Sequence, residues 1–440
     1  MKLGEKMSDL NINIHCFGPI NHANIELKKL NVIAGINGSG KTTSSKLLYC
    51  FLESNSGNGD YLAKVSINNR FEMMITALEK ELPPDSQSLL EVEELSDNLP
   101  DLNDNGFNAK MKTAINKLKM IVDDSQIPNK DEYLKKITDM DESLELSNDG
   151  CRMFFEISNV LLRSEFNIED LKIDENTDVQ FYADKNNCKF SSKLDSNGSK
   201  MGFKINDGNL NCLDNKNVLY IDLVSAFDLK NLSRTYLKDA PFHLRVLSES
   251  LYSTKDNGDV FDPLFNQKVD ECLNKVNSLL GGYIYYDVDE GEFIFKRNGD
   301  EYHMRNTAFG VKQLGVVQVL LSNGILNENS FLIMDEPETH LHPEWQVKLA
   351  KLIILLIKEL NISVFINSHS PHFIEALEVL SGKYGLVEDS MFYLSEESEN
   401  NLFNFREIER RNLNVLYDNL GNSYDEIDEI RIENAFNGIE

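Results

Sequence analysis

The stretch NVIAGINGSGKTTSSKLLYCF, residues 31–51, constrains the fold of this chain more than any other. Its first apolar residues predict a short buried strand, and the residues from Thr42 onward place apolar side chains at helical spacing. Between them, Gly35, Gly40, Lys41 and Thr42 fit the pattern G-x-x-x-x-G-K-[ST]. A glycine-rich turn could match this pattern by chance, but a phosphate-binding loop requires a strand before it and a helix after it, and both are present.

The residue types of this loop suit phosphate binding. Glycines let the backbone turn tightly, so that several N–H groups point at one anion, and the new helix adds its partial positive charge. We expect Lys41 to reach the β- and γ-phosphates of ATP and the Thr42 hydroxyl to bind Mg²⁺. The predicted nucleotide-binding residues of the loop are Asn37, Gly38, Ser39, Gly40, Lys41, Thr42 and Thr43.

A second segment, SFLIMDEPETHLHP at residues 330–343, supplies acids that a phosphate loop lacks. Its apolar run predicts a buried strand that ends in Asp335 and Glu336. We expect Asp335 to hold the Mg²⁺ shell and Glu336 to orient or deprotonate the attacking water. The two acids could instead form a solvated turn, but the apolar run before them and Pro337 after them argue against this alternative.

Composition limits the other classes of protein. The chain has 72 acidic and 44 basic residues, a net charge of −28, so its surface repels nucleic acid on average, although a local basic patch could still bind it. The six cysteines form no C-x-x-C pair, which argues against a zinc or redox site. No secretory signal and no apolar run of the ~18 residues that a membrane helix needs is visible, so we expect a cytoplasmic protein with no membrane contact.

The periodicity of the rest of the chain alternates between strand and helix. Strands are predicted near the start, over 178–225 and as a hairpin at 283–296, and helices over 61–176 and 237–280. The order strand, helix, strand over 331–366 predicts parallel strands. Apolar and methionine residues at helical spacing in the first helical region, which include Met73 and Met74, are expected to pack in a core.

Two further groups of side chains could bind ligands. His340 and His342 form an H-x-H pair, but no other metal ligands cluster with them, so we favour structural or interface roles. A run of lysines could contact nucleic acid or an acidic partner, but interleaved acids favour a solvated helix face. These lysines are Lys110, Lys112, Lys117, Lys119, Lys130, Lys135 and Lys136.

Four segments, GINGSGKT, AFGVKQLG, IMDEPETHLHPEWQ and INSHSPHFIEAL, occur in this order. Together they resemble the ABC-type ATPase heads of the SMC, RecF and OLD group, and most of all the ATPase subunits of prokaryotic anti-phage systems. The resemblance implies an α/β fold, a P-loop NTPase head of ABC type with a mixed, mostly parallel sheet and a helical insertion. The expected divisions are 1–60 and 301–380 for the two parts of the head, 61–176 for the helical insertion, 177–300 for the middle of the head, and 381–440 for an acidic C-terminal segment.

The resemblance also implies roles for particular residues. Lys41 and Thr42 match the Walker A pair, and Asp335 and Glu336 match the Walker B aspartate and the catalytic glutamate. His369 matches the switch histidine that senses the γ-phosphate.

Residues 306–313 fall where the family has its signature segment, which caps ATP bound to the opposite protomer. A serine usually precedes the glycine of this segment, whereas here Phe309 precedes Gly310. The missing hydroxyl leaves the backbone N–H of Gly310, or Lys312, to contact the phosphate.

The function that the resemblance implies is an ATP hydrolase that uses Mg²⁺ and works as a conformational switch. Two chains or a higher homo-oligomer would sandwich ATP, and a separate effector such as a nuclease would respond, in defence against phage. The residues that follow Ser370 are too few for a nuclease domain. Two alternatives stay open: a RecF-like DNA-binding repair ATPase, and a scaffold that binds ATP with little turnover.

Overall fold

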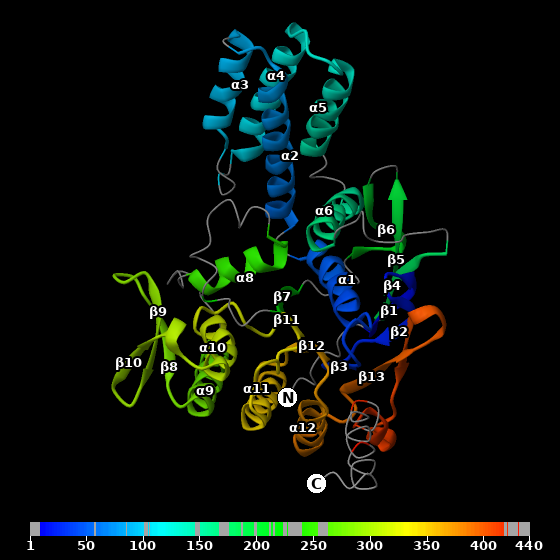
Figure 1. Cartoon of the computed structure of the whole chain (residues 1–440), viewed down its shortest axis with the longest axis vertical. Helices are drawn as coiled ribbons and strands as arrows, with labels where there is room; N and C mark the ends of the chain where they lie inside the picture. Colours follow the sequence, from blue (N-terminus) through cyan, green and yellow to red (C-terminus); the bar gives the residue numbers. More distant parts are fainter. Residues whose placement is uncertain are drawn as a thin grey trace.

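A single large sheet organises the chain, with helices on both of its faces and a group of helices that extends from one end (Figure 1). This computed structural model describes most of the polypeptide between residues 9 and 417. The described residues are 9–56, 59–84, 86–100, 104, 106–145, 150–166, 176–185, 188–197, 200–210, 213, 216–222, 227, 240–253, 263–417, 420 and 430.

The large sheet has the strand order β6-β5-β4-β1-β2-β14-β13-β3-β12-β11-β7. Its β6, β5, β4, β1 and β2 strands are antiparallel, whereas β13, β3, β12, β11 and β7 run parallel to one another. The bounds are β1 Asp9–Phe17, β2 Ile20–Glu26, β3 Leu30–Ala34, β4 Asp178–Lys185, β5 Cys188–Asn197, β6 Lys200–Gly208, β7 Asn217–Ile221, β11 Ser330–Asp335, β12 Ser363–Ser368, β13 Ser390–Glu397 and β14 Phe403–Glu407. The mixed sheet of an α/β fold is therefore present, and its parallel half contains both predicted motifs.

Strand β3 lies inside the parallel half and is buried along its whole length. Leu30, Val32 and Ala34 pack into the core on one face of the sheet, and Ile33 packs into the core on the other face. This alternation follows from the two-residue period of a strand, and burial on both faces explains why the segment is almost entirely apolar.

Helices cover the two faces of the parallel half. On one face lies α1 (Lys41–Ser54), and α6 (Gly150–Glu165) packs beside it against β6, in the antiparallel half of the sheet. On the other face lie α9 (Pro263–Leu280), α10 (Phe309–Ser322), α11 (Pro343–Leu360) and α12 (Pro371–Lys383). The short helix α8 (Phe242–Tyr252) contributes to both cores.

The helical insertion forms α2 (Gly59–Glu81), α3 (Gln87–Asp97), α4 (Phe107–Asp124) and α5 (Lys130–Glu145), which pack around a core of their own at the top of Figure 1. Met74 is buried there, but Met73 is 64% exposed. The expectation that both methionines pack in the core was therefore wrong for Met73. Successive residues of a helix point about 100° apart, and Met73 points away from the core that Met74 and Ile75 face.

Two strands of the expected C-terminal segment, β13 and β14, belong to the large sheet. Strand β13 pairs with β3, with Leu394 opposite Ala34, and β14 pairs with both β13 and β2. The fold of the sheet thus continues past residue 380, where the sequence suggested that the head ends.

A second sheet of three antiparallel strands lies beside α10 and has the order β10-β9-β8. Its strands β8 (Tyr283–Asp287) and β9 (Glu292–Arg297) form the predicted hairpin, and β10 (Asp300–His303) was not expected. No helix in the described part of the chain combines the length and the apolar character needed to cross a membrane.

Candidate nucleotide site

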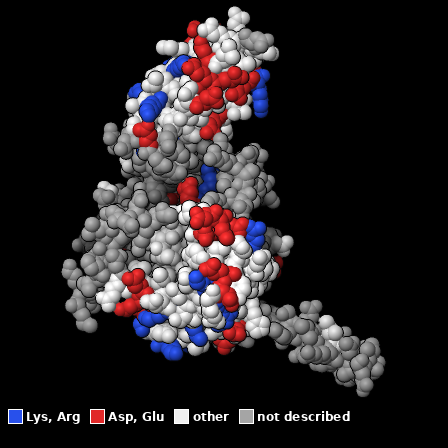
Figure 2. Space-filling model, turned by 90° about the vertical axis from the view of Figure 1, so that its left-hand side faces the viewer, with Lys and Arg blue, Asp and Glu red and all other residues white. Residues whose placement is uncertain are grey.

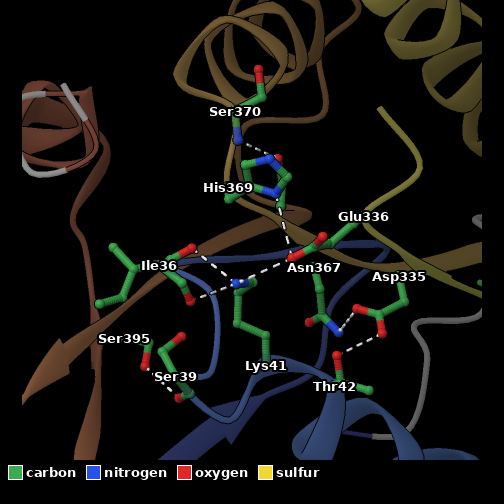
Figure 3. Close-up of polar contacts among 12 residues, drawn as sticks. Ile36, Ser39, Lys41, Thr42, Asp335, Glu336, Asn367, His369, Ser370 and Ser395 are labelled. Carbon is green, nitrogen blue, oxygen red and sulfur yellow. Dashed lines mark hydrogen bonds and ion pairs between the residues drawn. The ribbon is translucent and has the colours of Figure 1, made fainter. Parts of the chain in front are cut away.

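The glycine-rich loop connects the end of β3 to the start of α1 at the edge where the parallel strands end (Figure 3). Gly40 has φ of 88°, and a Cβ atom there would lie 2.6 Å from Cγ1 of Ile20. A Cβ atom on Gly35 would lie 2.8 Å from the Ser39 hydroxyl and 2.9 Å from Cβ of Ser395. The loop can therefore keep this shape only with glycine at both positions.

Lys41 lies inside the loop, with its side chain almost fully buried. Its Nζ donates hydrogen bonds to the carbonyl oxygens of Gly35 (2.9 Å) and Ile36 (2.8 Å) and lies 3.5 Å from Oε1 of Glu336. Burial lowers the pKa of Lys41, and the neighbouring Glu336 opposes this shift. The ammonium group is thus held at the cradle, where a phosphate oxygen could replace the carbonyl groups as its partner.

Asp335 and Thr42 meet at the start of α1. The Thr42 hydroxyl donates a hydrogen bond of 2.7 Å to Oδ2 of Asp335. Burial raises the pKa of Asp335, while the hydrogen bonds from Thr42 and Asn367 favour its charged form. Two hard oxygen ligands at this separation, beside a loop that suits phosphate, fit Mg²⁺, which takes a few protein oxygens and completes its shell with water and phosphate.

Asp335 is held by a buried network that the sequence did not reveal. Asn367 pairs with Asp335 across the β12–β11 ladder, and its Nδ2 donates to Oδ1 of Asp335 (2.8 Å) and to the Ser45 hydroxyl (2.9 Å). The Tyr220 hydroxyl, at the end of β7, donates to Oδ2 of Asp335 (3.3 Å) and hydrogen-bonds Ser45 (2.8 Å). These contacts fix the rotamer of the carboxylate, so one oxygen faces Thr42.

Glu336 and His369 face each other over Lys41 (Figure 3). Nδ1 of His369 lies 3.4 Å from Oε1 of Glu336, the oxygen that also approaches Lys41. Glu336 has φ of 47°, and its backbone N–H donates to the carbonyl oxygen of Asn367 (2.9 Å). A non-glycine residue in this left-handed conformation is uncommon and frequently occurs at functional sites.

The predicted signature residues Phe309 and Gly310 begin α10 and contact the segment that follows Asp335. The three atoms nearest to a Cβ on Gly310 all belong to Trp345 of α11. The ring of Phe309, 50% exposed, lies 5.2 Å from the ring of His340. His342 begins α11, and its Nδ1 accepts the N–H of Glu344 (3.4 Å), which is a structural role.

The structure thus brings Lys41, Thr42, Asp335, Glu336 and His369 together, as expected, and Gly310 contacts α11. Asn37 and Gly38 are exposed at the tip of the loop, Thr43 is half-buried, and Ser39 and Gly40 are buried. Five residues of the site were not predicted from the sequence. Of these, Glu338 and Asn367 stand inside the recognised motifs, and Ser45 lies one turn after Thr42. No local sequence pattern marks Tyr220 or Ser395 as site residues. Tyr220 lies in β7, which pairs with β11, and Ser395 lies in β13, which pairs with β3.

Ser395 connects the C-terminal strands to the phosphate loop. Its hydroxyl donates to the carbonyl oxygen of Ser39 (2.8 Å), and its Cβ packs against Gly35. The Ser39 hydroxyl is buried without a hydrogen-bond partner among the described residues, so it has a free donor at the cradle. This arrangement explains how residues far along the chain shape the loop.

A glycine loop between a parallel strand and a helix, with a lysine that faces paired acids at the end of another parallel strand of the same sheet, defines the class of P-loop NTPases. The sequence matches the AAA ATPase domain family over residues 10–374, and the chain belongs to this family. No curated protein matches it.

Solved structures similar to this one include SMC head domains. That of Thermotoga maritima has 11% sequence identity and a TM-score of 0.40, and the match covers 92% of this chain and 99% of that chain. The Pyrococcus furiosus Smc head domain with an extended coiled coil, bound to the C-terminal domain of ScpA, has 11% identity and a TM-score of 0.42, with 97% and 99% covered.

Proposed function

We propose that this chain binds ATP with Mg²⁺ and hydrolyses it as a conformational switch. The observation that carries this proposal is the convergence of the two motifs, with Lys41 3.5 Å from Glu336 and Thr42 2.7 Å from Asp335. Phosphoryl transfer needs mainly positioning and charge neutralisation, and these groups are suited to both. Lys41 would contact the β- and γ-phosphates, Thr42 and Asp335 would hold Mg²⁺, and Glu336 would accept a proton from the attacking water.

We further propose that two chains complete the site. Around the cradle, Ile36 is 49% exposed, Asn37 and Gly38 are exposed, and Glu336 and His369 are half-exposed. A second copy over this face would exclude water from the γ-phosphate and would supply its own residues 306–313. Hydrolysis would then loosen the pair, and a separate effector such as a nuclease would respond, as the resemblance to anti-phage ATPases suggests.

Two substitutions test the ATPase. Lys41→Ala is expected to weaken ATP binding and abolish phosphate release, because no other cation among the described residues of the cradle can replace it. Glu336→Gln is expected to keep ATP bound while it lowers kcat by about 10²–10⁴-fold, the usual effect of a lost general base.

The measurements are steady-state phosphate release and equilibrium binding of ATP. The matched control for the second variant is Glu344→Gln, an exposed glutamate on α11 whose partner is Lys348. Near-normal turnover in Glu336→Gln would show that Glu336 does not accept the proton of the attacking water. Absent turnover in the wild-type chain would favour the scaffold that binds ATP without hydrolysis.

The surface charge gives less support to a DNA-binding repair ATPase than to the proposed switch. On the face shown in Figure 2, acidic side chains gather on the helical insertion, and basic side chains are scattered. Several lysines of the predicted basic run are paired with acids: Lys110 with Asp104, Lys117 with Glu94, Lys130 with Asp123 and Lys136 with Glu132. A DNA-binding titration at several salt concentrations separates the two functions, since a steep loss of affinity with salt would support the repair ATPase.

A further inference from the structure

Glu338 is a buried acid that the proposed reaction does not use. It lies three residues after Asp335, in the loop between β11 and α11, and only 2% of it is exposed. Glutamate is almost never fully buried unless its carboxylate is paired, because removing an unpaired charge from water costs several kcal/mol. Glu338 therefore requires hydrogen-bond partners that stabilise its buried carboxylate.

The partners of Glu338 belong to the loop that carries His369. Oε1 of Glu338 accepts the Ser368 hydroxyl (2.6 Å) and the backbone N–H of His369 (3.1 Å). Nδ1 of His369 lies 3.8 Å from the same oxygen. Burial raises the pKa of Glu338, and these hydrogen bonds oppose that shift. One carboxylate oxygen thus holds two successive residues of the β12–α12 loop.

The neighbouring contacts join the same two loops on either side. The carbonyl oxygen of Asn367 accepts the N–H of Glu336 (2.9 Å), and the Ser370 hydroxyl donates to Oε1 of Gln346 (2.9 Å). Each of the residues 367–370 is therefore bonded to the segment 336–346. Within this set, Glu338 makes the bonds that hold Ser368 and His369, and it is the most deeply buried carboxylate of the segment.

We propose that Glu338 is a positioning residue that holds His369 in register with Glu336 and with the γ-phosphate of bound ATP. The proposal rests on the proposed function, because His369 matters here only if ATP is hydrolysed. Glu338 accepts the backbone N–H of His369, the same residue whose ring Nδ1 lies 3.4 Å from Glu336. Loss of the anchor would let the loop move, and a displacement of about 1 Å near a reacting group can lower the rate by about 10²-fold.

The first test compares two substitutions of Glu338. Glu338→Ala is expected to lower kcat by roughly 10–100-fold, the usual range for loss of a group that orients a site residue. Binding of a non-hydrolysable ATP analogue is expected to stay within about threefold, since Lys41 and Thr42 keep their contacts. Glu338→Gln should recover most of the rate, because its amide oxygen can still accept from Ser368 and His369. Glu344→Ala is the control.

A double-mutant cycle separates positioning from general support of the fold. If Glu338 acts through His369, Glu338→Ala in a His369→Ala background is expected to change kcat by less than about twofold. Equal losses in both backgrounds would overturn the proposal, as would wild-type kcat in Glu338→Ala.

A third variant guards against a folding defect in Glu338→Ala. Ser368→Ala removes one of the two donors to the same oxygen and leaves the carboxylate bound to the N–H of His369. It is expected to lower kcat less than Glu338→Ala does, and to have no effect in the His369→Ala background; an effect retained there would count against the proposal. Absence of phosphate release in the wild-type chain would instead refute the proposed function itself, so the two failures are distinguishable.

Discussion

At the scale of single residues, the site depends on side chains that orient other side chains. Thr42 and Asp335 have the right chemistry for Mg²⁺, but Asp335 can rotate, and its orientation comes from Asn367 and Tyr220. Such partners are typical of metal sites, where outer contacts fix the ligand geometry. The buried amide of Asn367 is therefore as much part of the site as the carboxylate it holds.

Asn367→Ala is expected to raise the Mg²⁺ concentration required for half-maximal phosphate release by about tenfold, since the loss of an outer contact to a metal ligand typically costs 10–100-fold. The substitution removes the amide that donates to Oδ1 of Asp335. Glu344→Ala, a change at an exposed residue of α11, is the control. An unchanged Mg²⁺ dependence in Asn367→Ala would show that Asp335 does not need this support.

At the scale of elements, a buried histidine in α8 joins the end of α6 to the sheet. Nδ1 of His243, in α8, lies 2.6 Å from Glu165 at the end of α6, and its Nε2 lies 2.9 Å from Asp222 just after β7. Burial alone would lower the pKa of His243, but the hydrogen bonds to Asp222 and Glu165 outweigh it and raise this pKa to about 9. The histidine is thus charged at neutral pH and bridges two acids.

This bridge predicts how stability changes with pH. The pKa of His243 is higher in the folded chain, about 9, than in the unfolded chain, about 6.5. Its contribution to the free energy of unfolding is therefore complete below pH 6.5 and is lost as the pH rises through 9. Among the described residues, the titratable side chains that face the bridge include Lys46, Tyr49, Cys50 and Tyr220.

His243→Ala is expected to lower the free energy of unfolding at pH 7 by about 3–5 kcal/mol, because it removes the charged ring that pairs with the buried Glu165 and with Asp222. Urea unfolding at pH 6.5 and at pH 9.5 checks both points. The wild-type chain should lose stability between these values, and the variant should lose much less. A wild-type stability that does not change over this range would contradict a charged His243.

At the scale of the whole molecule, the nucleotide site depends on segments from both ends of the chain. Strand β3 lies between β12 and β13, so the phosphate loop is flanked by strands that begin more than 300 residues later. The helical insertion has its own core and lies between α1 and α6 in the sequence. Helices α1 and α6 nevertheless pack against each other.

A chain that ends after residue 380 is expected not to fold. It would lose Phe392, Tyr393 and Leu394, which are buried against the sheet, and it would expose β3 as an open edge beside the phosphate loop. A chain that ends after residue 420 keeps these strands and serves as the control. The measurement is thermal unfolding followed by circular dichroism; a cooperative transition in the shorter chain would contradict the expectation.

Elements that a few consecutive residues encode could be predicted from the sequence. The short buried strand, the glycine loop and the following helix all lie within residues 31–51. Periodicity and the motif were therefore enough to predict Lys41 and Thr42 at the start of the helix. The apolar run before Asp335 likewise predicted a strand that pairs in parallel with the one over residues 362–366, and the ladder between β11 and β12 confirms this pairing. The hairpin of β8 and β9 followed from its turn residues.

Other features could not be read locally. The pairing of β13 with β3 depends on how two distant strands share an edge, so neither segment contains a signal for the other. The same holds for Tyr220 and Ser395, ordinary residues that reach the site because the carboxyl ends of parallel strands align. Met73 looked like a core residue because its spacing fits, and only the packing of α2 decides which face is buried.

By itself, the sequence determined the chemistry of this protein: a loop whose glycines and lysine suit phosphate, and a strand that ends in two acids. Both signals are local, because a motif and its flanking periodicity occupy a few consecutive residues. The tertiary structure alone decided that the lysine and the acids face one another, that Asn367 and Glu338 hold the acid and histidine loops in place, and that the C-terminal strands complete the sheet. These are contacts between residues that are distant in the sequence, by 31 positions for Glu338 and His369 and by 293 for Thr42 and Asp335, and their geometry exists only after the chain has packed.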